Sequence, residues 1–465
     1  MKKFRNNEPV KILFFITVIL SAISVMPNYL KGSKKINLYS DIVNKKSKKD
    51  ETQNLAIVND SVFFKNDTIK PVLKDTAKSS SVKVNYKIGE LDLSEFFEAL
   101  HNNENENGKI RIAWFGDSMI EGDLVTQDFR KLMQKLFGGS GVGFVPVTSP
   151  VAQFRQTIRQ TFSDDWQVYS FIKKPRQNFK LGIGGYSFVS SKGSWVDYKT
   201  SRLYPVYSEV KIICRQCPAA SFILNEDTAD VFPIDSVTAF KEIELVKNKT
   251  IKGIKLTFEK PGCEIHGLYF DNGKGVYVDN FSFRGNSGIP LSNIPFGELK
   301  NLGTKENYKL IILSYGLNVV AHDIKNYSWY ASSFQKTLNY IKEAFPDASI
   351  LIMSVGDKSY RAEDGYETEP DIPVFVELQK RIAQRSNVAF YNLYEAMGGY
   401  NSMVGWAEGN PRLANLDYTH PNFAGGRKIA GMLYDDIIKS YDRYSKTVSV
   451  MEVKKDTIID PQAKQ

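Results

Sequence analysis

Cysteine and histidine are scarce in this chain, which limits the metal and redox chemistry available to it. Three cysteines and four histidines occur among 465 residues. Cys214 and Cys217 have the C-x-x-C spacing of zinc and redox sites, but neither a second C-x-x-C nor a nearby pair of histidines accompanies them. Cys263 and His266 could supply two further ligands, although their surroundings are typical of strands. Structural cysteines or one disulfide are therefore favoured over a metal site.

The sequence also lacks an arginine-rich helix and any recognisable nucleic-acid motif. Its net charge of +9, with many lysines near the N-terminus, does not by itself indicate nucleic-acid binding. A basic surface is equally suited to an anionic polysaccharide or an anionic membrane surface. The content of 42% hydrophobic and 12% aromatic residues excludes a wholly disordered chain. The length is sufficient for about two or three domains, and we expect no nucleic-acid partner.

A long uncharged segment lies near the N-terminus. Residues 12–26 form this run, which basic residues precede. No A-x-A-like cleavage site follows, and no cysteine is placed for lipid attachment, so residues 1–30 are interpreted as an uncleaved signal anchor. Lysines on both sides leave the orientation open under the positive-inside rule. Because the first segment usually acts as an export signal, we expect a membrane-anchored, extracytoplasmic protein on the periplasmic or cell-surface side.

Most of the remaining chain alternates between strand-like and helix-like segments. Polar residues dominate 31–86, interpreted as a tether, and 441–465, interpreted as a loose tail. The apolar run 110–115 predicts a strand buried on both faces. A hydrophobic stripe then predicts a helix that ends at Gly138. Comparable strand and helix signals follow at 308–316, 328–345, 348–356, 372–386, 387–393 and 422–441. This alternation predicts a parallel sheet covered by helices on both faces.

The middle of the chain has a different pattern. Between about residues 150 and 283, short strand-like runs are separated by Gly, Pro and Asn turns, which predicts an antiparallel β-sandwich or barrel. We therefore interpret residues 151–283 as an insertion between two parts of one α/β domain, residues 87–150 and 284–440. Trp166 and Trp195 in the insertion could stack on sugars, but core packing is the favoured interpretation.

Three polar clusters follow predicted strands or precede the last helix. Ser118 comes after Gly-Asp, Asn318 lies in Gly-Leu-Asn, and Asp417 and His420 form an Asp-x-x-His motif. Active sites of open parallel sheets lie at the carboxyl ends of the strands. A serine hydroxyl needs a base to accept its proton, and a carboxylate to orient that base. Asn318 could donate a side-chain N–H to a developing oxyanion. A catalytic triad of Ser118, His420 and Asp417 is therefore the leading hypothesis.

In their order and wide spacing, these clusters resemble the sequence blocks of the SGNH (GDSL-type) hydrolase superfamily, over about residues 108–440. The resemblance implies a three-layer α/β/α, flavodoxin-like fold and a serine esterase that requires no metal or organic cofactor. It also implies an oxyanion hole formed by the Ser118 N–H, the Asn318 side chain and a glycine N–H of "FRGNSGIPLS". For that glycine we choose Gly288 over Gly285. Val319 occupies the place of an Asp that is common in the family after the Asn.

The inserted β-domain resembles the architecture of the peptidoglycan O-acetylesterases in this superfamily, which carry a carbohydrate-binding-like sandwich. The resemblance implies removal of O-acetyl groups from an O-acetylated envelope polysaccharide, with peptidoglycan favoured. An O-acetyltransferase would use the same triad, supplied with acetyl groups by a polytopic membrane acyltransferase partner. A non-catalytic glycan-binding envelope protein is the other alternative. The α/β-hydrolase pattern fits less well, because Ser118 does not lie in G-x-S-x-G.

Four other polar residues near these clusters receive simpler interpretations. Asp117 is expected to be a structural carboxylate of the turn before Ser118. Glu121 and Asp123 are expected to be solvated or to cap the following helix. His322 is expected at the rim of the site and not among the catalytic groups.

Overall fold

The computed structural model describes residues 91–459, apart from 173–179, 228–230, 323 and 325. The expected anchor, residues 1–30, and the expected tether, residues 31–86, lie outside these described residues. Within the described part of the chain, no helix is both long enough and apolar enough to cross a membrane.

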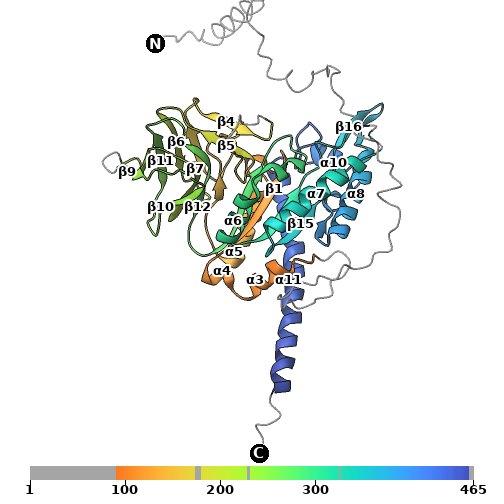
Figure 1. Ribbon diagram of the computed structural model, residues 1–465. Coiled ribbons are helices and arrows are strands. Elements are labelled where there is room, and N and C mark those ends of the chain that lie inside the picture. Colours follow the sequence, from red (N-terminus) through yellow and green to blue (C-terminus); the bar gives the residue numbers. More distant parts are fainter. Residues whose placement is uncertain (1–90, 173–179, 228–230, 323, 325, 460–465) are drawn as a thin grey trace, which may run out of the picture. The chain divides into compact units, whose positions relative to one another are not determined.

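A five-stranded parallel sheet forms the centre of the α/β part, in the order β13-β1-β14-β15-β18 (Figure 1). Its strands are β1 (Lys109–Gly116), β13 (Gly275–Ser282), β14 (Tyr308–Ser314), β15 (Ser349–Met353) and β18 (Ala389–Tyr391). They are buried nearly throughout, as apolar runs covered on both faces should be. The predicted parallel sheet is confirmed. The placement of residues 275–282 in the insertion was wrong, because β13 pairs with β1 along its whole length.

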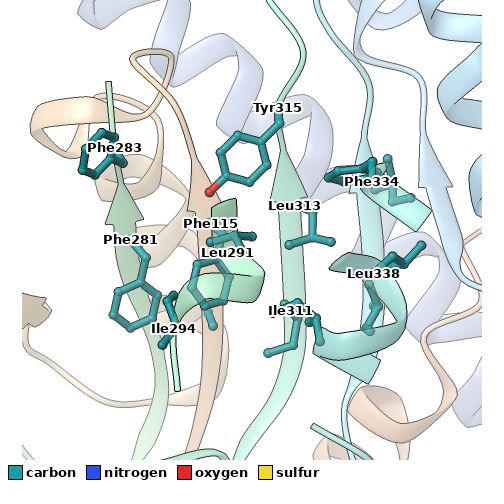
Figure 2. Close-up of a cluster of buried hydrophobic side chains, with 14 of the residues drawn as sticks. Phe115, Phe281, Phe283, Leu291, Ile294, Ile311, Leu313, Tyr315, Phe334 and Leu338 are labelled. Atoms are coloured by element: carbon teal, nitrogen blue, oxygen red, sulfur yellow. The ribbon is translucent and has the colours of Figure 1, made fainter. Parts of the chain in front are cut away.

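Helices cover both faces of this sheet. Ile112 and Trp114 of β1 belong to one apolar core, and Ala113 and Phe115 belong to the other. The first core includes side chains of α3 (Ser94–His101), α5 (Thr126–Phe137) and α11 (Phe423–Ile459). The second includes side chains of α6 (Phe296–Lys305), α7 (Ser328–Ala344) and α8 (Asp371–Ser386), and Figure 2 shows part of it. The alternation along β1 therefore produces a three-layer arrangement.

Two connections between elements of the α/β part contain short helices or strands of their own. Short helices α9 (Leu393–Met397) and α10 (Ser402–Glu408) lead from β18 toward α11. A hairpin, β16 (Ser359–Ala362) and β17 (Gly365–Thr368), follows β15. The prediction of a loose tail from residue 441 was wrong, because α11 remains helical to Ile459 (Figure 1).

The inserted region consists of antiparallel sheets that enclose a separate apolar core. One sheet has the order β10-β7-β12-β5-β4, with β2 also paired to β12, and the other has the order β3-β6-β11-β8-β9. The first comprises β2 (Gly143–Val145), β4 (Gln167–Ser170), β5 (Tyr186–Val189), β7 (Glu209–Gln216), β10 (Lys241–Val246) and β12 (Glu264–Asp271). The second comprises β3 (Arg159–Phe162), β6 (Ser194–Lys199), β8 (Ala220–Leu224), β9 (Val231–Ile234) and β11 (Gly253–Phe258). The antiparallel prediction is confirmed, although β2 shows that the sandwich begins before residue 151. Trp166 is buried against Phe258 in its core.

The cysteines all lie in or beside this sandwich. Cys217 is joined to Cys263 by a disulfide, and Cys214 is buried and free. Burial raises the pKa of the Cys214 thiol to about 12, so this thiol remains protonated at neutral pH. Cys214 and Cys217, the two cysteines of the C-x-x-C motif, are therefore not bonded to each other. Among the described residues, no group of three or more His, Cys, Asp or Glu side chains is arranged to hold a metal ion.

A buried ionic cluster joins the parallel sheet to the insertion. Arg111 of β1 is completely buried, and its guanidinium contacts the carboxylates of Asp271, Asp279 and Glu306. The distances are 3.2 Å from Nη1 to Asp279 and 2.8 Å from Nε to Glu306. The same guanidinium lies 4.5 Å from the centre of the Tyr269 ring. Although burial acts to lower the pKa of Arg111, the three carboxylates raise it well above its usual value, so the guanidinium is charged.

Candidate active site

Ser118 lies just beyond the carboxyl end of β1, the second strand of the sheet. The chain leaves the strand through Gly116, where a Cβ atom would lie 2.7 Å from Ser314 Oγ and 2.9 Å from the Ile120 side chain. Only glycine therefore allows the turn to pack this closely against β14. The turn brings Ser118 Oγ to 2.9 Å from His420 Nε2, a hydrogen-bond distance.

His420 and Asp417 share one loop between α10 and α11. Asp417 Oδ2 lies 2.8 Å from His420 Nδ1. The other carboxylate oxygen accepts the backbone N–H groups of Thr419 and His420, both at 3.0 Å. Tyr418, at the centre of the loop, has φ of +52°, a conformation that few non-glycine residues adopt. This turn fixes both catalytic candidates in one short segment.

The contacts determine how protons are arranged along this chain of groups. Partial burial acts to raise the pKa of Asp417, but hydrogen bonds from the His420 ring and the loop N–H groups outweigh it and hold the pKa below its usual value. The carboxylate is therefore ionised and can only accept hydrogen bonds. His420 Nδ1 must carry the proton, which leaves Nε2 of the neutral ring free to accept the Ser118 hydroxyl proton.

Close packing of α11 against the segment after Ser118 sets the position of His420. A Cβ atom on Gly426, in the first turns of α11, would lie 2.4 Å from the Leu124 carbonyl oxygen. Gly431, five residues further along the same helix, has open space where a Cβ would project. The glycine at 426 therefore permits a contact that a side chain would prevent.

We expect Gly426→Ala to destabilise the fold by about 1–3 kcal/mol, because the added methyl group must push α11 away from Leu124. His420 precedes this helix, so its hydrogen bond to Ser118 should lengthen and the reactivity of the Ser118 hydroxyl should fall. Urea unfolding and hydrolysis of p-nitrophenyl acetate measure the two effects. The matched control Gly431→Ala should be neutral or stabilising by up to about 1 kcal/mol. Equal stability and activity in both variants would contradict this account.

Asn318 follows β14, and its side chain is held by Asp117 from the neighbouring strand. Its Nδ2 donates to Asp117 Oδ2 at 2.9 Å and approaches the Asn286 carbonyl oxygen at 3.3 Å. Asp117 also accepts the N–H of Met119 at 3.0 Å, so it connects the serine turn to Asn318. Asp117 is 1% exposed, and burial raises its pKa to about 6 in spite of these hydrogen bonds.

The raised pKa of Asp117 predicts a specific dependence of stability on pH. Since the pKa rises from 3.8 to about 6 on folding, the protonated group contributes stability below about pH 4, and that contribution is lost as the pH rises through 6. Asp117→Asn lacks this titration. The free energy of unfolding of the variant minus that of the wild type should therefore increase by up to about 3 kcal/mol from pH 4 to pH 7. Urea titrations at both pH values provide the measurement, and a difference that does not change with pH would contradict it.

Two glycines follow β13, and their backbone N–H groups differ. The Gly288 N–H donates to Asn286 Oδ1 at 2.9 Å, and the Gly288 backbone is packed against Tyr315 and Phe334. A Cβ atom on Gly285 would meet no other atom within 4 Å. Within the described residues, no hydrogen bond uses the backbone N–H of Gly285 or of Ser118. The structure therefore argues against our choice of Gly288 as the oxyanion donor, because its N–H already has an acceptor, and favours Gly285.

The sheet order brings these donors to one edge. Gly285 follows β13, Ser118 follows β1 and Asn318 follows β14, and these three strands are neighbours with β1 in the middle. The Phe283 N–H also donates to the Gly116 carbonyl oxygen at 2.9 Å, which holds the Gly285 segment beside the serine turn. Figure 2 shows the apolar layer formed by the same strands, with Phe281, Phe115 and Leu313 side by side. A rigid core thus supports the strand ends that carry the polar groups.

Asp123 is buried, so its interpretation as a solvated or capping residue was wrong. It is 1% exposed and has φ of +70°. Its carboxylate accepts two hydrogen bonds from Arg130, at 2.8 and 2.9 Å, and one from Thr157 at 2.7 Å. Burial acts to raise the pKa of Asp123, but Arg130 and Arg155 lower it far below its usual value. The residue fastens the segment after Ser118 to the first segment of the insertion.

Glu121 is largely covered, with a side chain that is 9% exposed, and it forms an ion pair with Arg284, whose side chain is 63% exposed. The expectation that Glu121 is solvated or caps a helix was therefore wrong. His322 is half exposed, and its Nδ1 lies 3.0 Å from Glu369 Oε1. His322 is therefore a partly exposed histidine paired with Glu369, and its expected place at the rim of the site stays a prediction.

The sequence interpretation missed the hairpin β16–β17 beside the loop that carries the candidate catalytic residues Asp417 and His420. The Ser359 N–H donates to the Tyr418 carbonyl oxygen at 2.9 Å. The Tyr366 ring stacks on the Tyr418 ring, with centroids 3.6 Å apart and planes at 11°. Closely spaced tyrosines at 360, 366, 394 and 400 were a signal in the sequence, but nothing local placed them next to His420.

Comparison with known proteins adds evidence on the fold. No protein-family model and no curated protein matches the sequence. A solved structure of a peptidoglycan O-acetylesterase is similar, with a TM-score of 0.60 and 20% identity over 75% of this chain and 96% of that chain.

Two other solved structures are similar only at lower TM-scores. A family two carbohydrate esterase from Cellvibrio japonicus has a TM-score of 0.26 and 8% identity, covering 62% of this chain and 99% of its own. A salicylyl-acyltransferase from a tetracycline biosynthetic pathway has a TM-score of 0.29 and 12% identity, covering 64% of this chain and 96% of its own. These scores are too low to support an argument. At 20% identity, the likeness to the O-acetylesterase structure shows that this chain has the same fold over the part that is covered.

Proposed function

We propose that this protein is a serine esterase that removes O-acetyl groups from a polysaccharide of the cell envelope, with peptidoglycan the favoured substrate. The observation that carries the proposal is the continuous hydrogen-bonded chain from Asp417 through His420 to Ser118. The similar solved structure of a peptidoglycan O-acetylesterase supports the choice of substrate. A triad is recognised by geometry and roles, and this geometry fits acyl transfer.

In the proposed mechanism, Ser118 Oγ attacks the acetyl carbonyl carbon while His420 Nε2 takes the hydroxyl proton. The negative oxygen of the tetrahedral intermediate accepts hydrogen bonds from the backbone N–H groups of Ser118 and Gly285. Asn318 Nδ2 becomes the third donor by giving up its 3.3 Å contact with the Asn286 carbonyl oxygen. His420 then gives its proton to the departing sugar oxygen, which leaves an acetyl-Ser118 ester. Water attacks this ester as His420 Nε2 takes a proton from it, and His420 then gives that proton to Ser118 Oγ as acetate leaves. Asp417 stabilises the imidazolium at both steps.

Exposure of the site favours hydrolysis over transfer to a sugar. The side chains of His420 and Asp417 are 36% and 48% exposed, so water can reach the acetyl-enzyme from the surface. The disulfide between Cys217 and Cys263 is typical of proteins in oxidising compartments. It supports the proposed extracytoplasmic location, in which residues 1–30 anchor the chain.

Acetate release from a panel of O-acetylated polysaccharides, including peptidoglycan, tests the proposal. We expect release by the wild type and none by Ser118→Ala, and labelling of Ser118 by a fluorophosphonate. Addition of a sugar acceptor distinguishes an esterase from an O-acetyltransferase, since the transferase would form acetylated acceptor in place of acetate. Absence of both labelling and acetate release would overturn the proposal.

A further inference from the structure

Exposed tyrosines gather next to the catalytic loop, on the hairpin β16–β17 and the segment before α10. Tyr366 is 36% exposed, although one face of its ring is stacked on Tyr418. Tyr400 is 63% exposed. Its hydroxyl donates to Glu367 Oε2 at 3.1 Å, and the Tyr360 hydroxyl donates to the other oxygen of the same carboxylate. One glutamate thus holds tyrosines from two segments together.

The hairpin is continuous with the catalytic loop. Its first strand is hydrogen-bonded to the Tyr418 carbonyl, and its second strand places Tyr366 on the Tyr418 ring. Tyr418 lies directly after Asp417 and two residues before His420. Since the catalytic side chains are themselves partly exposed, a polymer that presents an ester to Ser118 can continue over this hairpin.

The side chains of the hairpin are those that recognise uncharged sugars. The electron-rich face of an aromatic ring attracts the polarised C–H groups on the face of a sugar ring. Carboxylates accept hydrogen bonds from sugar hydroxyl groups. The exposed turn carries Glu363 and Asp364 beside Arg361, and Glu367 adds a third carboxylate. This excess of negative charge opposes anionic sugars.

We propose that the hairpin β16–β17 and Tyr400 form a binding subsite for an uncharged sugar residue of the glycan chain, adjacent to the residue whose acetyl group reaches Ser118. Tyr366 provides the stacking face, and Tyr400 and the carboxylates contact the ring and its hydroxyl groups. The inference rests on the proposed function, because it takes the ligand to be the acetylated glycan. It adds the part of the protein that selects a polymeric substrate over a small ester.

The test compares two substrates across matched variants of the full-length chain. For Tyr366→Ala and Tyr400→Ala, we expect the ratio of kcat/KM on an acetylated neutral glycan to kcat/KM on p-nitrophenyl acetate to fall about five- to tenfold. Tyr366→Trp, which keeps an aromatic face, should retain the wild-type ratio. Tyr434→Ala, a partly buried tyrosine of α11 outside the insertion, is the control and should also retain it. An unchanged ratio in both alanine variants would overturn the subsite.

Two further outcomes separate the inference from its alternatives. An equal loss on both substrates in Tyr366→Ala would show that the ring only braces the Tyr418 loop, which overturns its role in binding. Glycan binding by Ser118→Ala, with and without Tyr400→Ala, is measured by calorimetry using neutral and uronate-containing acetylated oligosaccharides. We expect the neutral ligand to bind more tightly and the second substitution to weaken it about five- to tenfold. If the wild type hydrolyses no ester, the proposed function fails, while this binding measurement still decides the subsite.

Discussion

Replacing Ser118 by alanine is expected to lower kcat for ester hydrolysis about 10⁴- to 10⁶-fold. The hydroxyl is the nucleophile in the proposed mechanism, and its 2.9 Å contact with His420 Nε2 provides the route for its proton. What remains is the contribution of the oxyanion donors and of substrate binding, which do not depend on the hydroxyl. Acetate release under saturating substrate measures the effect.

Asp417→Asn provides the companion measurement. The amide cannot hold His420 Nδ1–H as an ionised carboxylate does, so the ring loses the tautomer in which Nε2 accepts a proton; kcat should fall about 10⁴-fold. Loss of both groups in one variant should cost little more than loss of Ser118 alone, because the members of a triad act as a unit. For both variants, the urea concentration at the midpoint of unfolding should lie within a few tenths molar of the wild-type value. Near-wild-type turnover by Ser118→Ala would refute the assignment.

Arg111→Met is expected to be the most destabilising single substitution among those considered, by about 3–5 kcal/mol. The substitution removes the guanidinium that contacts Asp271, Asp279 and Glu306 together. Lys109 still contacts Asp271 and Lys211 still contacts Glu306, so the buried carboxylate of Asp279 suffers the largest loss. Because these acids come from β12, β13 and the end of α6, the loss should weaken the junction between the parallel sheet and the insertion. Urea unfolding at pH 7 measures it.

An exposed ion pair is the matched control for Arg111. Arg381 lies 3.0 Å from Glu377 on α8, and both side chains are half exposed. Arg381→Ala should change the free energy of unfolding by less than about 1 kcal/mol, since water already solvates both charges. Arg111→Lys should be destabilising as well, because an ammonium cannot reproduce the fork of the guanidinium. Equal effects of Arg111→Met and Arg381→Ala would show that the buried cluster contributes nothing special.

Local sequence patterns predicted the elements of the α/β part well. The run at 110–115 became β1, and Gly138 ends α5. Such features depend on the apolar content and backbone conformation of residues close in sequence. The sequence did not show that β13 belongs to the parallel sheet, because its apolar run is like those of the insertion. Only its pairing with β1, some 160 residues earlier, distinguishes it. The burial of Asp123 was not predicted for a similar reason, since its partners Arg155 and Thr157 come from the insertion.

The sequence predicted which residues form the candidate site but not all of the hydrogen bonds among them. The order of Ser118, Asn318 and Asp417/His420 relative to strand ends was visible, because the ends of parallel strands lie at one edge. The use of the Gly288 N–H by Asn286, and the bridge from Asp117 to Asn318, were not visible. Each depends on hydrogen bonds whose geometry is set by the packing of neighbouring strand ends. The hairpin beside Tyr418 was missed for the same reason.

By itself, the sequence determined the alternation of strands and helices, the β-rich insertion and a short set of polar residues suited to acyl transfer. These follow from periodicity and side-chain chemistry, which act over a few residues. Only the tertiary structure decided that His420 lies 2.9 Å from Ser118 across 302 positions of sequence, and that Cys263 and not Cys214 is the partner of Cys217. Contacts over such separations depend on how whole sheets and helices bury their apolar faces together, and no local pattern carries that information.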